Sequence, residues 1–203
     1  MKVYESEAKT KELALDKCLE EARANKDEVL FKSKETVSGI LKKSKYKVTL
    51  ITKAEVKEEI MSFFTELGNR MNIKITPEVN IEEHIFVVTL DSSNNAVMIG
   101  KDGRSMKSLQ ILVKQSIVSK TGINVKINLD VSGYKEKKLK HLENTVKRVA
   151  SEVIQSKIDT KLDSMNSYER RFVHSIINEY TMLETKSEGE EPNRYIVISY
   201  KQD

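Results

Sequence analysis

The sequence predicts an α+β protein built from three small domains, at residues 1–53, 54–132 and 133–203. Three observations predict it. Helix-type and strand-type periodicities alternate along the chain, Ser132-Gly133 separates a strand pattern from a long helix pattern, and a helix pattern starts at Ala54 directly after a strand pattern. Charged residues make up 33% of the 203 residues and apolar residues 38%, a composition typical of a charge-rich folded chain.

The first predicted domain has the order strand, helix, strand, strand, at residues 3–7, 11–24, 29–33 and 46–50. Thr10 is expected to cap the helix. Residues 37–45 are predicted to form a basic loop that either touches RNA or an acidic partner or, as we favour, is only solvated. The one cysteine, Cys18, lies on the apolar helix face, which predicts a buried thiol and excludes an internal disulfide framework.

The second predicted domain has the order helix, strand, strand, helix, loop, helix, strand, at residues 54–71, 73–79, 85–90, 96–99, 100–103, 106–117 and 123–131. Pro77 lacks an N–H group, which predicts an edge strand. His84 is expected to be exposed at a turn. The helix after the loop is expected to bury one stripe and to turn Lys107, Gln110 and Lys114 away from it; the stripe comprises Met106, Leu109, Leu112, Val113, Ser116 and Ile117.

The Gly100-Lys-Asp-Gly103 loop is the main candidate site. Glycines allow another backbone to approach closely, and the N-terminus of the following helix suits a phosphate. The candidate RNA-binding residues in this region are Val97, Ile99, Gly100, Lys101, Asp102, Gly103, Arg104 and Lys107. A plain helix-to-helix turn is the alternative interpretation, with Val97 and Ile99 only packing the short helix. Residues 54–132 contain nine basic and ten acidic residues, so this domain has no large positive field. Any affinity for nucleic acid must therefore come from the local placement of Lys101 and Arg104.

The third predicted domain begins with a long helix that has one basic side, at Lys135, Lys137, Lys138, Lys140, Lys147 and Arg148. A strand at 158–162, a helix from 167 to 178 and strands at 181–185 and 195–200 follow. Arg170 and His174 are one helical turn apart on the same face, where they can bind phosphate and a base. The alternative is an Arg bonded to an acidic neighbour beside a half-buried His. Arg171 and Arg194 complete the candidate set.

These motifs together resemble the bacterial Jag family, also called the KhpB, EloR or SpoIIIJ-associated family. The element order around Gly100–Gly103 is similar to a type II KH domain, and the segments 165–174 and 187–194 are similar to an R-x-x-x-H domain. The resemblance covers the whole chain and implies a Jag N-terminal domain, a KH domain and an R-x-x-x-H domain. Residues 37–43 match the family's N-terminal loop only in part, and the spacer at 52–54 is shorter than in many relatives.

The resemblance implies a cytoplasmic, single-stranded RNA-binding regulator that acts near cell-envelope growth and the membrane insertase. It also implies a small KH-only protein partner, and a homodimer is possible for such a domain. The alternative is a protein-interaction scaffold that uses the Jag and KH domains. We expect no enzyme activity, no metal and no cofactor, because His84, His141 and His174 lie in separate predicted elements and no nucleotide-hydrolysis loop occurs. We also expect no transmembrane segment.

Overall fold

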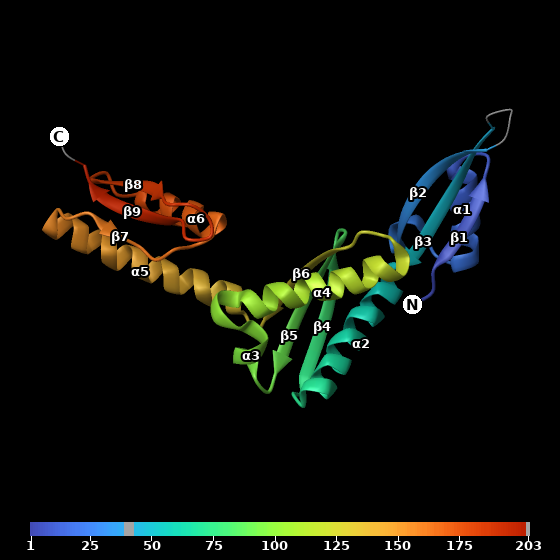
Figure 1. Cartoon of the computed structure of the whole chain (residues 1–203), viewed down its shortest axis with the longest axis horizontal. Coiled ribbons are helices and arrows are strands. Elements are labelled where there is room, and N and C mark those ends of the chain that lie inside the picture. The colour runs from blue at the N-terminus through green and yellow to red at the C-terminus, as the bar shows by residue number, and fades with distance from the viewer. Residues whose placement is uncertain (39–42, 202–203) are drawn as a thin grey trace. The chain divides into compact units, whose positions relative to one another are not determined.

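Three separate three-stranded sheets, each with helices packed against it, make up the fold (Figure 1). The structure is a computed structural model that describes residues 1–38 and 43–201. It divides into two compact units, Met1–Gly133 and Tyr134–Asp203. The predicted α+β class is confirmed. The division into three domains with the bounds given above stays a prediction.

The first sheet has the order β1-β3-β2, in which both pairs are antiparallel. Its strands are β1 (Tyr4–Ala8), β2 (Val29–Ser38) and β3 (Lys43–Thr52). Thr10 caps helix α1 (Lys11–Ala22) as predicted, since its side chain accepts a hydrogen bond from the Leu13 N–H. A short 3-10 turn, η1 (Lys26–Glu28), leads to β2. Cys18 of α1 has no exposed surface and packs in the core between α1 and β3, so the predicted buried thiol is confirmed.

The loop predicted at residues 37–45 is wrong at both ends. Val37 and Ser38 continue β2, and residues 43–45 already belong to β3, because the pairing extends to Ser38 opposite Lys43. The middle of the predicted loop, residues 39–42, lies outside the described residues. The sequence did not predict the full length of the β2–β3 hairpin, because the mostly polar residues near its tip show no alternation of apolar and polar side chains.

The second sheet has the order β4-β5-β6, with β4 antiparallel and β6 parallel to the central strand. The elements in chain order are α2 (Lys53–Met71), β4 (Ile75–Glu82), β5 (Ile85–Ser92), α3 (Asn95–Ile99), η2 (Lys101–Gly103), α4 (Arg104–Thr121) and β6 (Lys126–Val131). Helix α2 packs on β4, α4 packs on β6, and the two helices touch each other. Pro77 lies on edge strand β4, as predicted.

Thr52 ends β3 and also caps α2. Its side chain accepts from the Glu55 N–H, while a Glu55 carboxylate oxygen accepts from the Thr52 N–H at 3.2 Å. This reciprocal pair is a capping box, which satisfies donors that a helix start leaves free. The helix therefore begins at Lys53 directly after the strand, one residue before the predicted start at Ala54.

Two details of the second sheet differ from prediction. Strand β6 starts at Lys126 and not at Ile123, because β5 starts at Ile85, which pairs with Lys126. On α4, Leu112 was expected in the buried stripe but is 56% exposed. Gln110 was expected to face away, yet its Oε1 accepts from the Leu129 N–H of β6 at 2.9 Å. The stripe is therefore rotated toward Met106, Val113 and Ile117, which are buried.

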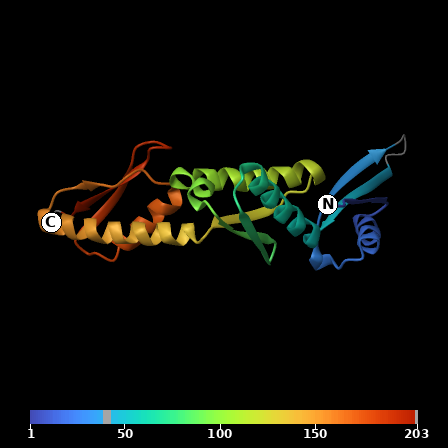
Figure 2. The same cartoon turned by 90° about the horizontal axis from the view of Figure 1, so that it is seen from below.

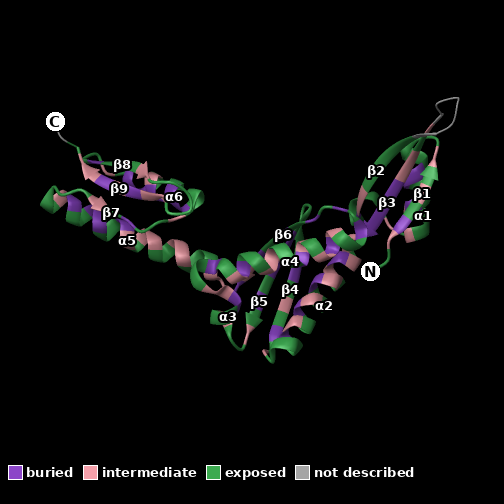
Figure 3. Ribbon diagram, viewed as in Figure 1, coloured by how far each residue is buried: buried purple, intermediate pink, exposed green. Residues whose placement is uncertain are grey.

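The second unit places α5 (Tyr134–Ser156) and α6 (Ser167–Ile177) against a sheet of order β7-β9-β8 (Figure 2). The strands are β7 (Thr160–Lys161), β8 (Leu183–Glu188) and β9 (Tyr195–Tyr200). The predicted pairing of the last two strands is confirmed. The strand predicted at 158–162 shrinks to two residues, and Ile158 is exposed. Buried residues of both helices and of β9 share one core (Figure 3), formed by Val146, Val149, Ala150, Val153, Val173, Ile176, Ile177, Ile196 and Ile198.

Candidate nucleic-acid interface

The Gly100–Gly103 loop forms a sharp corner between α3 and α4. The Gly100 N–H closes α3 by donating to the Ala96 carbonyl at 2.8 Å. Gly100, Asp102 and Gly103 have φ values of 68°, 57° and 82°, all in the range that glycine tolerates best. Gly103 is the N-cap of α4 and offers no side chain to the first-turn N–H groups. The positive end of an 18-residue helix is therefore left without a side-chain cap.

The space beside Gly100 is occupied by the protein itself. A Cβ at Gly100 would collide with the hydroxymethyl group of Ser105, in the first turn of α4. Ser105 therefore makes the close approach to the Gly100 backbone that the absence of a Cβ permits. Both this contact and the positive φ require glycine here, whether or not a ligand binds. No sequence pattern singled out Ser105.

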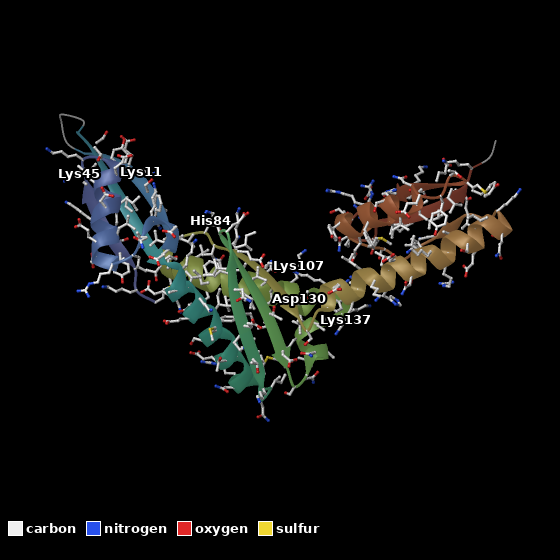
Figure 4. The ribbon with its side chains drawn as sticks, turned by 180° about the vertical axis from the view of Figure 1, so that it is seen from behind. Lys11, Lys45, His84, Lys107, Asp130 and Lys137 are labelled. Carbon is white, nitrogen blue, oxygen red and sulfur yellow. The ribbon has the colours of Figure 1, made fainter. Side chains whose placement is uncertain are left out.

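Three cations surround the start of α4. Lys101, Arg104 and Lys107 are exposed, and within the part of the chain that the structure describes none of them forms an ion pair (Figure 4 labels Lys107). Asp102 is also exposed and places one negative charge among them. The loop thus combines backbone donors with unpaired positive charge, an arrangement that suits a phosphate chain.

The apolar residues before the loop divide into two roles. Val97 is 44% exposed and Ile99 is half-buried, so both can contact a ligand. Met98, which lies between them, is 1% exposed and belongs to the core. The side-chain amide of Asn95 donates to the Ser132 Oγ at 2.8 Å and ties α3 to the end of β6. These contacts hold the corner in place on the sheet.

Arg170 of the R-x-x-x-H motif is engaged within the protein. It is 7% exposed, its Nη1 donates to the Met165 carbonyl at 2.8 Å, and its Nη2 lies 2.8 Å from a Glu191 carboxylate oxygen. The guanidinium therefore joins the loop before α6 to the turn before β9. This geometry corresponds to the alternative of an Arg bonded to an acidic neighbour, and the RNA contact assigned to Arg170 stays a prediction.

His174 is half-buried and bonded through both ring nitrogens. Nδ1 lies 2.6 Å from the Thr185 Oγ1 and Nε2 lies 3.0 Å from the Ser187 Oγ, both on β8. Burial lowers the pKa of His174, and the nearby positive charge of Arg170 lowers it further. The side chain is therefore a neutral link between α6 and β8 near pH 7. Its two partners lie on a strand that the sequence predicted only in part, so no spacing rule could have identified them.

The other two cations of this region differ in accessibility. Arg171 is exposed, whereas its neighbour Arg170 is buried. Arg194 is half-buried, and its Nε is a buried donor without an acceptor among the described residues. The basic side of α5 is partly neutralised, since Lys138 lies 2.7 Å from Glu169 and Arg148 lies 2.6 Å from Glu152. The two predicted motifs lie in different units, the Gly100–Gly103 loop in Met1–Gly133 and the Arg170–His174 pair in Tyr134–Asp203.

Within the described residues, no three His, Cys, Asp or Glu side chains are grouped so that they could hold a metal ion. His84 lies at the turn between β4 and β5 (Figure 4), while His141 is on α5 and His174 on α6. Nor does any helix in residues 1–38 and 43–201 have the length and apolar character needed to cross a membrane.

Comparison with known proteins places these features in a family. An RNA-binding protein KhpB from Clostridium symbiosum is 30% identical over 201 residues, which cover 97% of this chain and 90% of that protein. The chain belongs to the KhpB family. The KhpB proteins of Bacillus subtilis and Streptococcus pneumoniae (strain D39) are 24% identical over 165 residues and 25% identical over 144 residues.

Two family models match separate parts of this KhpB-family chain. The model described as KhpA/KhpB, KH domain matches residues 57–129, which contain the Gly100–Gly103 loop. The model of the R-x-x-x-H domain matches residues 140–200, which contain Arg170 and His174. The resemblance found in the sequence is thereby confirmed. The matched region covers 79% of the B. subtilis protein but only 44% of the S. pneumoniae protein, so the relatives differ in length.

Proposed function

We propose that this KhpB-family chain binds single-stranded RNA in the cytoplasm through its KH loop and acts as a regulator rather than as an enzyme. One observation carries the proposal. Lys101, Arg104 and Lys107 are exposed and without ion partners in the described chain, around an α4 N-terminus that has no side-chain cap. A KH loop of this kind clamps about four backbone nucleotides, which must be unpaired to enter it.

The comparisons support RNA as the ligand. The relatives from C. symbiosum, B. subtilis and S. pneumoniae carry the name RNA-binding protein KhpB, and the models of the KH and R-x-x-x-H domains match this chain. By the same family resemblance, we place the chain in control of cell-envelope growth, near the membrane insertase and with a small KH-only partner. The division into Jag, KH and R-x-x-x-H domains at residues 1–53, 54–132 and 133–203 is part of this proposal.

The proposal is tested by reversing two charges of the loop. Lys101→Glu together with Arg104→Glu should lower the affinity for a labelled single-stranded RNA of about ten nucleotides by at least about ten-fold at low salt. The slope of log affinity against log salt should shrink by about 0.7 for each lost phosphate contact. Fluorescence anisotropy of the full chain at several salt concentrations measures both.

The matched control is Lys126→Glu, at the opposite end of the same sheet. Lys126 is exposed on β6 and pairs with Ile85, next to the His84 turn and away from α3. Like each substitution in the loop variant, Lys126→Glu replaces a positive side chain by a negative one. It should leave the slope of log affinity against log salt unchanged. Equal losses in the loop variant and the control would show that the loop is not the site.

The α4 surface favours a second function, pairing with another KH domain. Ile111 and Leu112 are adjacent on α4 and are 57% and 56% exposed, although both are large and apolar. Exposing two such side chains to water is unfavourable, so burying them against a partner would stabilise the complex. A second copy of this chain or a small KH-only protein would then cover this face, and the chain would serve as an interaction scaffold.

Sedimentation velocity tests this second function. The wild-type chain should sediment as a dimer at micromolar concentration or form a complex with a KH-only partner. Leu112→Asp should remove either species, whereas Leu13→Asp, which changes another exposed leucine on α1, should not. A wild-type chain that is monomeric both alone and with such a partner would exclude the pairing.

A further inference from the structure

A hollow of about 370 Å³ lies on the second unit, between the loop that precedes α6 and the start of β9. It is lined by Lys161, Leu162, Asp163, Ser164, Asn193 and Tyr195. None of these residues belongs to α6, so the hollow is not formed by the R-x-x-x-H motif. Its volume is near the lower end for small-ligand sites, which is enough for one nucleotide and too little for a duplex.

The walls of the hollow are fixed by hydrogen bonds between its two loops. The Leu162 N–H donates to the Ile196 carbonyl at 2.9 Å, and the Met165 N–H donates to the Arg194 carbonyl at 3.0 Å. Arg170 adds a third tie, from the Met165 carbonyl on one loop to Glu191 on the other. A buried guanidinium with two partners is costly to disturb, so Arg170 holds the spacing of the walls.

The lining combines an aromatic ring, a cation and polar side chains. The Lys161 ammonium lies 3.7 Å from the centroid of the half-buried Tyr195 ring. An aromatic face can stack on any base, and an adjacent ammonium can bind the phosphate of the same nucleotide. Asp163, Ser164 and Asn193 supply acceptors and donors for the polar edge of a base. The combination of features is that of a nucleotide site more than that of an apolar ligand site.

We propose that this hollow binds one unpaired nucleotide of RNA, with its base against Tyr195 and its phosphate on Lys161. Arg170 acts as a positioning residue that ties the two walls together at a fixed spacing, and it does not touch the RNA. The inference rests on the proposed RNA-binding function and identifies where the second unit would make its contact. Lys161 moves from the ring to the phosphate when the base stacks.

The contact is tested by anisotropy of the full chain with labelled single-stranded RNA. Tyr195→Leu should weaken binding by between about five-fold and about 150-fold, the range for loss of one base stack. Lys161→Glu should weaken binding and reduce the salt slope by about 0.7. The matched control is Lys157→Glu, because Lys157 also lies over a tyrosine ring of this unit, 5.1 Å from the Tyr200 centroid, and is not among the residues that line the hollow. Equal effects of Lys161→Glu and Lys157→Glu would overturn the proposal.

The role of Arg170 is tested through its partner. Glu191→Ala removes the carboxylate from Arg170 and frees its charge. A positioning Arg170 predicts weaker RNA binding, whereas an Arg170 that contacts phosphate predicts stronger binding. Glu190→Ala, the adjacent exposed carboxylate, makes the same charge change and should not weaken binding. Stronger binding by Glu191→Ala than by Glu190→Ala would overturn the positioning role.

A separate readout distinguishes this proposal from the proposed KH function. Adenosine, guanosine, cytidine and uridine 5′-monophosphates, each titrated into the labelled full chain, should shift the NMR amide signals of Ser164, Asn193 and Tyr195. If RNA binding persists and depends on Lys101 while these signals stay fixed, the hollow is excluded and the KH function stands. If the hollow signals shift while the loop variant has no effect on RNA binding, the hollow stands and the KH loop fails.

Discussion

His174 is kept neutral by its position between α6 and β8. Protonation would not break its two hydrogen bonds, because the hydroxyl oxygens of Thr185 and Ser187 can accept from both ring nitrogens. Burial first, and the charge of Arg170 second, lower the pKa of His174 in the folded state below its usual value of about 6.5. The unfolded chain therefore takes up this proton at a higher pH than the folded chain does.

The pH dependence of stability follows from this difference. Where the unfolded state binds more protons, stability rises with pH, so the contribution of His174 is complete above about pH 6.5 and is lost as pH falls through the lower folded pKa. His174→Gln should flatten the loss of unfolding free energy between about pH 7 and about pH 5, measured by urea unfolding. The same comparison at about pH 8 is the control, because histidine is neutral in both states there. An unchanged slope below about pH 6.5 would contradict the expectation.

Arg170 illustrates what the sequence could and could not predict about the site. The i, i+4 spacing correctly placed Arg170 and His174 within one turn of α6. It could not show which way the guanidinium points, because Glu191 and the Met165 carbonyl reach it from two loops whose paths the helical spacing does not fix. Likewise, the exposure of Lys101 and Arg104 was predictable, but the packing of Ser105 on Gly100 was not.

At the scale of the elements, α6 has a capping box at its N-terminus. The Asn166 side chain accepts from the Tyr168 and Glu169 N–H groups, and a Glu169 carboxylate oxygen accepts from the Asn166 N–H at 2.9 Å. Lys138 of α5 also contacts the Glu169 carboxylate, at 2.7 Å. One buried glutamate thus serves both the cap of α6 and the packing of α5 beside it.

Removing this cap should weaken α6 measurably. Asn166→Ala should lower the stability of the helix by about 1 kcal/mol, since two N–H groups lose their acceptor. Asn166→Ser should retain most of that stability, because a serine hydroxyl can also cap a helix. Hydrogen exchange of the α6 amides reports the change: exchange should accelerate in the alanine variant and stay near wild type in the serine variant. Equal exchange in all three proteins would show that the cap contributes nothing.

Element order was predictable from the sequence, while element ends were not. The cap at Thr10 and the proline on β4 were both expected from single residues, because these signals act locally. The lengths of β2, β3, β6 and β7 depend on which residues lie opposite in the sheet. Leu112 was misplaced for the same reason, since a helical stripe alone does not fix which neighbours cover each of its residues.

On the scale of the whole molecule, charge is nearly balanced. The net charge is +4, from 35 basic and 31 acidic residues. A long-range positive field is therefore weak, and RNA binding depends on a few cations close to phosphates. Lys147 and Arg148 of α5 add little, because Glu143 and Glu152 already lie beside them.

This balance predicts a shallow salt dependence for the complete chain. Lys101, Arg104 and Lys107 of the loop, together with Lys161 of the hollow, at about 0.7 per phosphate contact, give a slope of about −3 for log affinity against log salt. Lys140→Glu, on the exposed side of α5, should leave that slope unchanged. Anisotropy titrations with the same RNA between low and physiological salt measure it. A slope of about −5 or steeper would mean that α5 or another basic surface binds the backbone as well.

The buried position of Cys18 gives the chain a built-in chemical reporter. It is the sole cysteine in the sequence, it has no exposed surface, and its Sγ lies 3.8 Å from the Val48 carbonyl of β3. An alkylating reagent can reach it only when α1 separates from that strand. The rate of alkylation, followed by mass spectrometry without any engineered label, therefore measures how often this one contact opens, and partners that bind the N-terminal sheet should slow it.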